Sequence, residues 1–85
     1  MTIVKIGNVE LTEAEALRLY EEGRYIVTGR KIYALHYSNA RRRVYGSVVY
    51  QQPKSEPMPL VARGRFHALC PADVNRLIGA ELLNA

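Results

Sequence analysis

The sequence has one cysteine, no long hydrophobic run and almost no acidic residues in its middle. Cys70 cannot form an intramolecular disulfide on its own, and a lone thiol is more typical of a reducing compartment than of secretion. No 18 apolar residues occur together, so we expect no membrane-spanning helix. The first residues, MTIVKIGNVEL, lack the basic and apolar regions of a signal peptide. These absences predict a cytoplasmic protein with no membrane contact.

Motifs for catalysis and for metal binding are missing as well. The chain contains neither G-x-x-x-x-G-K-[ST] nor G-x-G-x-x-G, and His36, His67, Cys70 and Asp73 fit no zinc-ligand spacing. His67 and Cys70 have the form of a base and a nucleophile, but no orienting third residue or oxyanion donor can be identified. We therefore expect a protein with no catalytic activity, no metal and no cofactor.

The composition is that of a small folded protein. Its 85 residues are 48% hydrophobic and 24% charged, which predicts one compact domain over residues 1–85. A core of this size leaves a thin stability margin, and dimerisation would widen it. The segment KIYALHYS has no plainly polar face, so we expect it to be buried on both sides or covered by a partner subunit. A homodimer is the corresponding prediction.

The order of the elements follows from capping residues and hydrophobic periodicity. TIVKI is a short strand, and LTEAEALRLYEEG is a helix with Thr12 as N-cap, Glu15 completing a capping box and Gly23 just beyond its end. The pattern then predicts strands over residues 24–28, 31–38, 43–51 and 60–69. A proline-rich loop over 51–59 separates the last two, and a second helix spans 70–83.

This order, about β-α-β-β-β-β-α, predicts an α+β fold. We expect a small, mainly antiparallel sheet with two helices packed on one face. The other face would then remain open for function. Gly46, inside a strand, indicates a bulge or the close approach of another backbone.

The charge of the chain is concentrated in its middle. The net charge is +4, but residues 24–69 hold nine basic residues and one acid, a net of +8. If strands 43–51 and 60–69 formed a hairpin, their outward side chains would share one face. That face and the preceding arginine-rich turn give the candidate binding site: Arg41, Arg42, Arg43, Tyr45, Arg63, Arg65 and His67.

Two functions suit such a surface. Arginine suits phosphates and tyrosine stacks on bases, so the first hypothesis is a nucleic-acid-binding module, with a sheet platform for single strands or an arginine finger for a duplex groove. The second is an inhibitor or adaptor that docks the same arginines on the acidic surface of a target protein. A small domain without chemistry would suit an accessory protein of a phage or mobile element.

Overall fold

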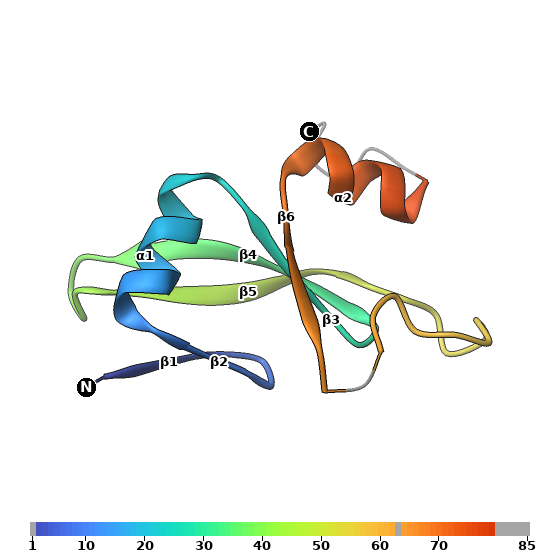
Figure 1. Ribbon diagram of the computed structural model, residues 1–85, viewed down its shortest axis with the longest axis horizontal. Helices are drawn as coiled ribbons and strands as arrows, with labels where there is room; N and C mark the ends of the chain where they lie inside the picture. The colour runs from blue at the N-terminus through green and yellow to red at the C-terminus, as the bar shows by residue number, and fades with distance from the viewer. Residues whose placement is uncertain (1, 63, 80–85) are drawn as a thin grey trace.

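The computed structural model describes residues 2–62 and 64–79 and confirms an α+β fold (Figure 1). Its elements are β1 (Ile3–Ile6), β2 (Val9–Thr12), α1 (Glu13–Glu21), β3 (Tyr25–Thr28), β4 (Lys31–Ser38), β5 (Arg43–Gln51), β6 (Phe66–Leu69) and α2 (Pro71–Ile78). The sequence predicted all of these except β2. That strand pairs with β1 through the Gly7-Asn8 turn, so the first unit is a two-stranded hairpin rather than a single strand. No helix in the described parts of the chain has the length and apolar character needed to cross a membrane.

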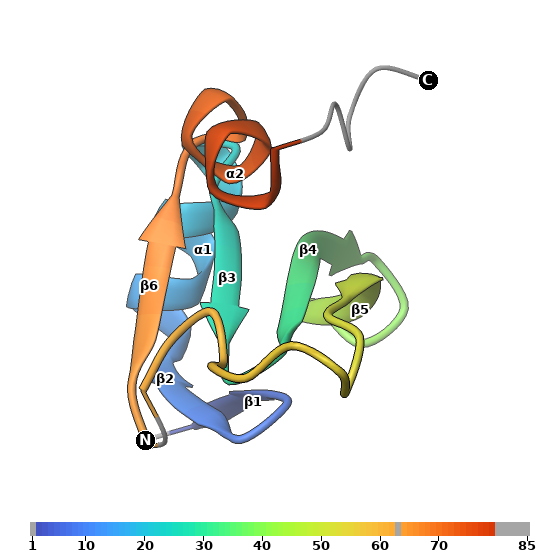
Figure 2. The same cartoon turned by 90° about the vertical axis from the view of Figure 1, so that its right-hand side faces the viewer.

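The second sheet has the strand order β5-β4-β3-β6, with every neighbouring pair antiparallel. It is strongly twisted, so that β3 and β6 run side by side while β4 and β5 turn away from them (Figure 2). The predicted hairpin of residues 43–51 and 60–69 is therefore wrong. The chain after β5 crosses the end of the sheet, where the amide of Val61 donates to the carbonyl of Gly29 at 3.2 Å, and it returns as β6 on the far side of β3.

The predicted strand over residues 60–69 is also too long. It begins only at Phe66, because Gly64 adopts a left-handed backbone (φ 81°) that interrupts extended pairing. Before that point Val61 is buried and Leu60 is half-buried, although the alternation placed these two residues on opposite faces of a strand. Both pack against the sheet from a loop.

The ends of α1 confirm Thr12 as the N-cap and Gly23 as the residue just beyond the helix, but the Glu15 carboxylate accepts from the Thr12 hydroxyl at 3.2 Å and not from the Thr12 amide, as a capping box requires. The amide of Glu15 donates to Thr12 Oγ1 at 3.1 Å, and the amide of Gly23, with φ 71°, donates to the carbonyl of Tyr20. In the second helix, α2, Pro71 occupies the first turn and Gly79 ends the helix in a left-handed conformation. The rest of the predicted second helix, residues 80–83, lies outside the described residues.

The two helices cover opposite faces of the sheet, which corrects the expectation that they share one. Adjacent residues of β3 show this, since their side chains point to opposite sides. Ile26 packs in a core with Ala16 of α1 and the β1–β2 hairpin, whereas Val27 packs in a second core with Val74 of α2. The apolar pattern of β4 has the same cause: Ile32 belongs to the second core and Tyr33 packs on the first. Two-sided cover within one chain accounts for that pattern, and the homodimer stays a prediction.

Gly46 allows the β1–β2 hairpin to pack closely on β5. A Cβ atom at this position would lie 2.7 Å from Cγ2 of Ile6, which is fully buried. The neighbour is thus a side chain, not a second backbone. The irregularity in the β4–β5 ladder lies elsewhere, between Ile32 and Tyr33. Gly46 therefore fixes how the β4–β5 hairpin sits on the rest of the molecule.

Candidate nucleic-acid interface

The structure does not bring the predicted site residues onto one surface. Arg43 and Tyr45 lie on β5 and His67 lies on β6, at opposite edges of the four-stranded sheet. The face between them is closed by the second core, where Val27 and Ile32 have no exposed surface. Arg65 precedes β6, and Arg63 lies outside the described residues. The continuous basic platform is therefore absent, because β5 and β6 are not neighbours.

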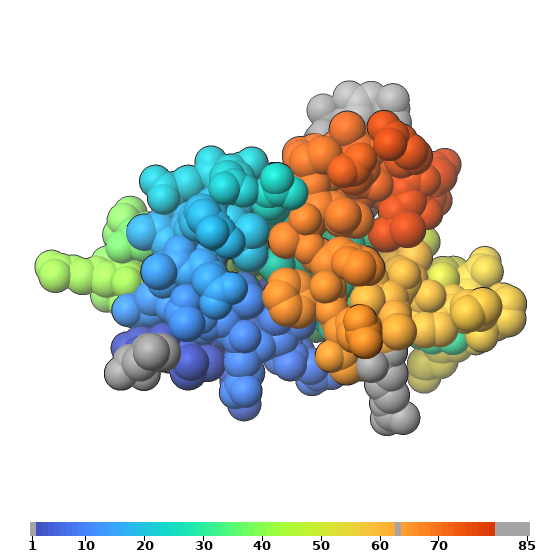
Figure 3. Space-filling view, in the orientation of Figure 1, coloured from blue at the N-terminus to red at the C-terminus, as the bar shows by residue number. Residues whose placement is uncertain are grey.

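The predicted arginine-rich turn is present, and it joins two paired strands. Residues 39–42 connect β4 to β5, and Ser38 pairs with Arg43 at the end of the ladder. The hydroxyl of Ser38 accepts a hydrogen bond from the amide of Arg41 at 3.2 Å, which holds the turn from inside. We call Arg41, Arg42 and Arg43 the tip cluster. Figure 3 shows that this end of the hairpin projects beyond the body of the molecule.

The backbone of Arg42 is unusual. Its φ is 54°, and among the described residues it is the one non-glycine with a positive φ; five glycines occupy the other such positions. A left-handed conformation costs an ordinary residue about 1–2 kcal/mol, whereas glycine adopts it freely. The turn therefore has an arginine at a backbone position that glycine would occupy at a lower free-energy cost.

The tip cluster forms no direct ion pair within the described residues, and Glu13 of α1 lines the same hollow as Arg42 and Arg43. All three side chains are exposed, and none takes part in an ion pair or hydrogen bond within the described residues. By contrast, Arg24 is held by Glu22 at 2.7 Å, and Arg76 lies 3.5 Å from Asp73. Three adjacent unpaired guanidinium groups on a projecting turn produce a concentrated positive potential.

Next to the tip, Tyr45 belongs to a small polar group that the sequence did not reveal. Its ring lies 5.2 Å from that of His36, the residue opposite it on β4, and His36 Nε2 is 2.7 Å from Ser47 Oγ. Tyr45 is 48% exposed, so its ring is oriented by His36 yet remains available for contact. Arg43 and Tyr45 share the same face of β5, as the alternation predicted.

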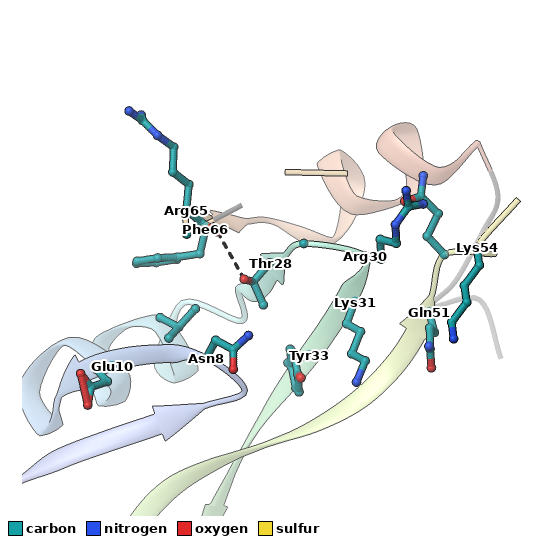
Figure 4. A pocket seen from close by; sticks show the side chains of 14 residues that line it. Asn8, Glu10, Thr28, Arg30, Lys31, Tyr33, Gln51, Lys54, Arg65 and Phe66 are labelled. Carbon is teal, nitrogen blue, oxygen red and sulfur yellow. Dashed lines mark hydrogen bonds between the residues drawn. The ribbon is translucent and has the colours of Figure 1, made fainter. Parts of the chain in front are cut away.

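A second group of cations lies at the other end of the β4–β5 hairpin. Arg30, Lys31, Lys54 and Arg65 line a cavity of about 750 Å³ beside the β1–β2 turn (Figure 4). We call this the basal cavity. Of these four residues the sequence selected only Arg65, because the others come from separate turns that the fold brings together. Seven residue steps along β4, at about 3.3 Å each, place the basal cavity roughly 23 Å from the tip cluster.

The structure also shows where the candidate metal ligands and the candidate nucleophile of the sequence lie. No group of three or more His, Cys, Asp or Glu side chains in residues 2–62 and 64–79 is arranged to hold a metal ion. Cys70 is the N-cap of α2 without a side-chain capping bond, and His67 is exposed on β6. Within the described residues, no hydrogen bond joins the two side chains.

Comparisons with protein-family models, with curated proteins and with solved structures give no match for this chain. The functional argument therefore depends on the geometry of its own residues.

Proposed function

We propose that the protein is a cytoplasmic, non-enzymatic module that binds double-stranded DNA by placing the β4–β5 hairpin tip in a groove. The observation that carries the proposal is the tip cluster itself: three exposed, unpaired arginines, one of them at a backbone position that favours glycine. Guanidinium groups bind phosphates and the edges of guanine through two parallel hydrogen bonds.

The shape of the hairpin supports a duplex rather than a single strand. A two-stranded β-ribbon fits the major groove of B-form DNA, which is about 12 Å wide. The β4–β5 ribbon ends in a four-residue turn and projects from the body of the molecule (Figure 3). A single-strand platform would need rings and cations spread across a sheet face, and here that face is interrupted by the second core.

The same geometry gives a preference between duplexes. The major groove of A-form RNA is deep and narrow, so side chains do not reach its base edges. A hairpin that enters a groove therefore binds DNA duplexes more tightly than RNA duplexes of the same sequence. A platform for single strands would give the opposite ranking, with unpaired oligonucleotides bound best.

The test is a titration of fluorescently labelled oligonucleotides, measured by anisotropy at several salt concentrations. We expect the DNA duplex to bind more tightly than the RNA duplex. The logarithm of the association constant should fall by about 0.9 per phosphate contact for each unit of the logarithm of salt concentration. At about 1 kcal/mol for each exposed arginine contact, R41Q/R42Q weakens duplex binding about 30-fold. The matched control R18Q/R76Q removes the same charge from α1 and α2 and changes binding less than about threefold. No binding at low salt, or equal losses in the two variants, contradicts the proposal.

A second candidate function is docking on an acidic protein surface. Leu17 and Tyr20 of α1 are exposed beside Tyr37 of β4, and the rings of Tyr20 and Tyr37 lie 6.1 Å apart. A hollow of about 150 Å³ adjoins this patch and is lined by Leu17, Tyr37 and Arg42. Tyrosine and arginine around an apolar centre are typical of protein interfaces.

The variant L17S/Y20S separates the two functions, because it leaves all three tip arginines in place. If the module binds DNA only, this variant keeps the native affinity for the duplex and the native set of co-purifying proteins after nuclease treatment. If it docks on a protein, one protein is recovered with the native chain and lost with both L17S/Y20S and R41Q/R42Q.

A further inference from the structure

The basal cavity has the size of a small-molecule site and is separate from the tip cluster. Its volume of about 750 Å³ lies within the range of roughly 300–1,000 Å³ that ligand pockets occupy. The lining comes from the β1–β2 turn, the β3–β4 turn, the end of β5 and the segment just before β6. None of Arg41, Arg42 and Arg43 contributes to it.

Hydrogen bonds and close packing fix the walls of the cavity. The amide of Gln52 donates to the carbonyl of Arg30 at 2.6 Å, and the guanidinium of Arg30 donates back to Gln52 Oε1 at 3.1 Å. Elsewhere in the lining, Tyr33 packs against Gly7, where a Cβ atom would lie 2.6 Å from the tyrosine hydroxyl. Arg30 is thus a structural cation, and the Tyr33 ring is held in place.

Three of the four cations that line the cavity, Lys31, Lys54 and Arg65, have no side-chain partner within the described residues, and the two lysines point in the same direction. Lys31 and Lys54 form no hydrogen bond or ion pair within the described residues. Figure 4 shows their side chains pointing to the same side of the ribbons, with Gln51 between them, while Arg65 points away. Glu10 is the one acid among the lining residues, so the cavity carries a net positive charge that suits an anion with several oxygen atoms.

The remaining lining groups suit more than an inorganic anion. Asn8 and Gln51 carry amide groups that both donate and accept hydrogen bonds, as the edge of a nucleobase requires. Phe66 is 38% exposed at the cavity and offers a ring for stacking. Glu10 provides an acceptor for a sugar hydroxyl. The cavity is also far larger than the ~30 Å³ that a water molecule takes up in the liquid, so a bare phosphate would leave most of it unfilled.

We propose that the basal cavity binds a nucleoside phosphate, either free or as the phosphorylated end of a nucleic-acid strand. Lys31 and Lys54 hold the phosphate, while the Asn8, Glu10 and Phe66 side of the cavity takes the nucleoside. This site goes beyond the proposed duplex binding, because it lies at the other end of the hairpin and uses none of the same arginines.

The test is a titration of the ¹⁵N-labelled protein in which amide chemical shifts report binding. The probes are adenosine 5′-monophosphate, adenosine, inorganic phosphate, and one short single strand prepared with a 5′-phosphate or a 5′-hydroxyl. We expect the monophosphate to shift amides around Asn8, Lys31 and Gln51, and to bind at least about tenfold tighter than adenosine or phosphate. K31Q/K54Q weakens it at least about tenfold, since both lysines are exposed and the variant folds, while R41Q/R42Q binds it like the native protein.

The remaining outcomes identify the source of the ligand or overturn the proposal. Tight binding of the free monophosphate indicates a nucleotide ligand, whereas binding of the 5′-phosphorylated strand alone indicates a strand end. The proposal is overturned if neither adenosine 5′-monophosphate nor the 5′-phosphorylated strand shifts the cavity amides. It is also overturned if inorganic phosphate binds as tightly as the nucleotide, or if K31Q/K54Q binds the nucleotide like the native protein. R41Q/R42Q leaves the basal cavity intact. A failure of the nucleotide-binding proposal can therefore be distinguished from a failure of the duplex-binding proposal.

Discussion

The two ends of the β4–β5 hairpin carry similar charge but differ in shape. At one end, Arg41, Arg42 and Arg43 stand on a projecting turn, where the hollows that they line have volumes of about 150, 320 and 330 Å³. At the other end, Lys31 and Lys54 flank a partly open cavity of about 750 Å³ lined with amides and rings. Arginines on a protrusion suit an extended polyanion that comes to the protein, whereas lysines around a cavity suit a small anion that enters it.

The difference shows that a count of basic residues does not define a binding surface. In sequence, residues 24–69 form one basic region with a net charge of +8. In the structure, that region separates into two sites roughly 23 Å apart, because the strand between them is extended. We therefore expect each site to bind its own ligand and to respond separately to mutation.

Reversing the charge at each end gives the largest expected effects. R41E/R42E/R43E weakens binding to a DNA duplex by more than about 100-fold, since three contacts become three repulsions. K31E/K54E changes duplex binding less than about tenfold. Anisotropy titrations with the same duplex at one salt concentration measure both. Equal losses from the two ends would mean that the whole basic region acts as one surface.

A substitution at Gly46, midway along β5, tests whether close packing on Ile6 fixes the β4–β5 hairpin on the body of the molecule. G46A places a Cβ atom 2.7 Å from Ile6 Cγ2 and lowers the free energy of unfolding by about 1–3 kcal/mol. Chemical denaturation measures this change. I6V in the same background removes a methyl group near the clash and recovers part of the loss. If G46A is as stable as the native chain, the hairpin is not fixed on the body as described.

Thr12 is a control whose side chain lines neither of the two sites. T12A removes the oxygen that accepts from the amide of Glu15, and we expect a loss of about 1 kcal/mol in unfolding free energy. Duplex binding and nucleotide binding at 20 °C stay unchanged, because the side chain of Thr12 lines neither the basal cavity nor the hollow beside Arg42. A loss of either affinity without unfolding would place α1 in a binding surface.

Cys70 is expected to have the smallest effect. C70S leaves duplex affinity and nucleotide affinity within about twofold of the native values, since the thiol forms no capping bond in the structure and lines neither site. The same titrations measure it. A complete loss of function in C70S, with the fold intact, would instead support a reactive thiol.

Local features of this chain could be predicted from its sequence. Thr12 and Gly23 mark the ends of α1 through interactions within a few residues, and β4 and β5 have the bounds that the alternation indicated. The tip cluster was found for the same reason, since three consecutive arginines at a turn need no tertiary information. Its left-handed backbone at Arg42 was not predicted, because the turn sequence does not specify it.

Long-range features could not be predicted. The segment after β5 has an alternation that resembles a strand from Leu60 onward, but its path is set by contacts with Gly29 and Val74, which are distant in sequence. The partner of β6 is consequently β3, not β5. The basal cavity is built from several segments, so no pattern within one segment could have revealed it.

Substitution of Arg42 by glycine tests the central claim most directly. R42G relieves a left-handed residue at φ 54° and removes one guanidinium from the tip cluster. We predict that the free energy of unfolding rises by up to about 1 kcal/mol while the affinity for a DNA duplex falls about fivefold. Opposite changes in stability and binding would show that Arg42 is retained for contact with a ligand. A variant that binds the duplex as tightly as the native protein would contradict the account.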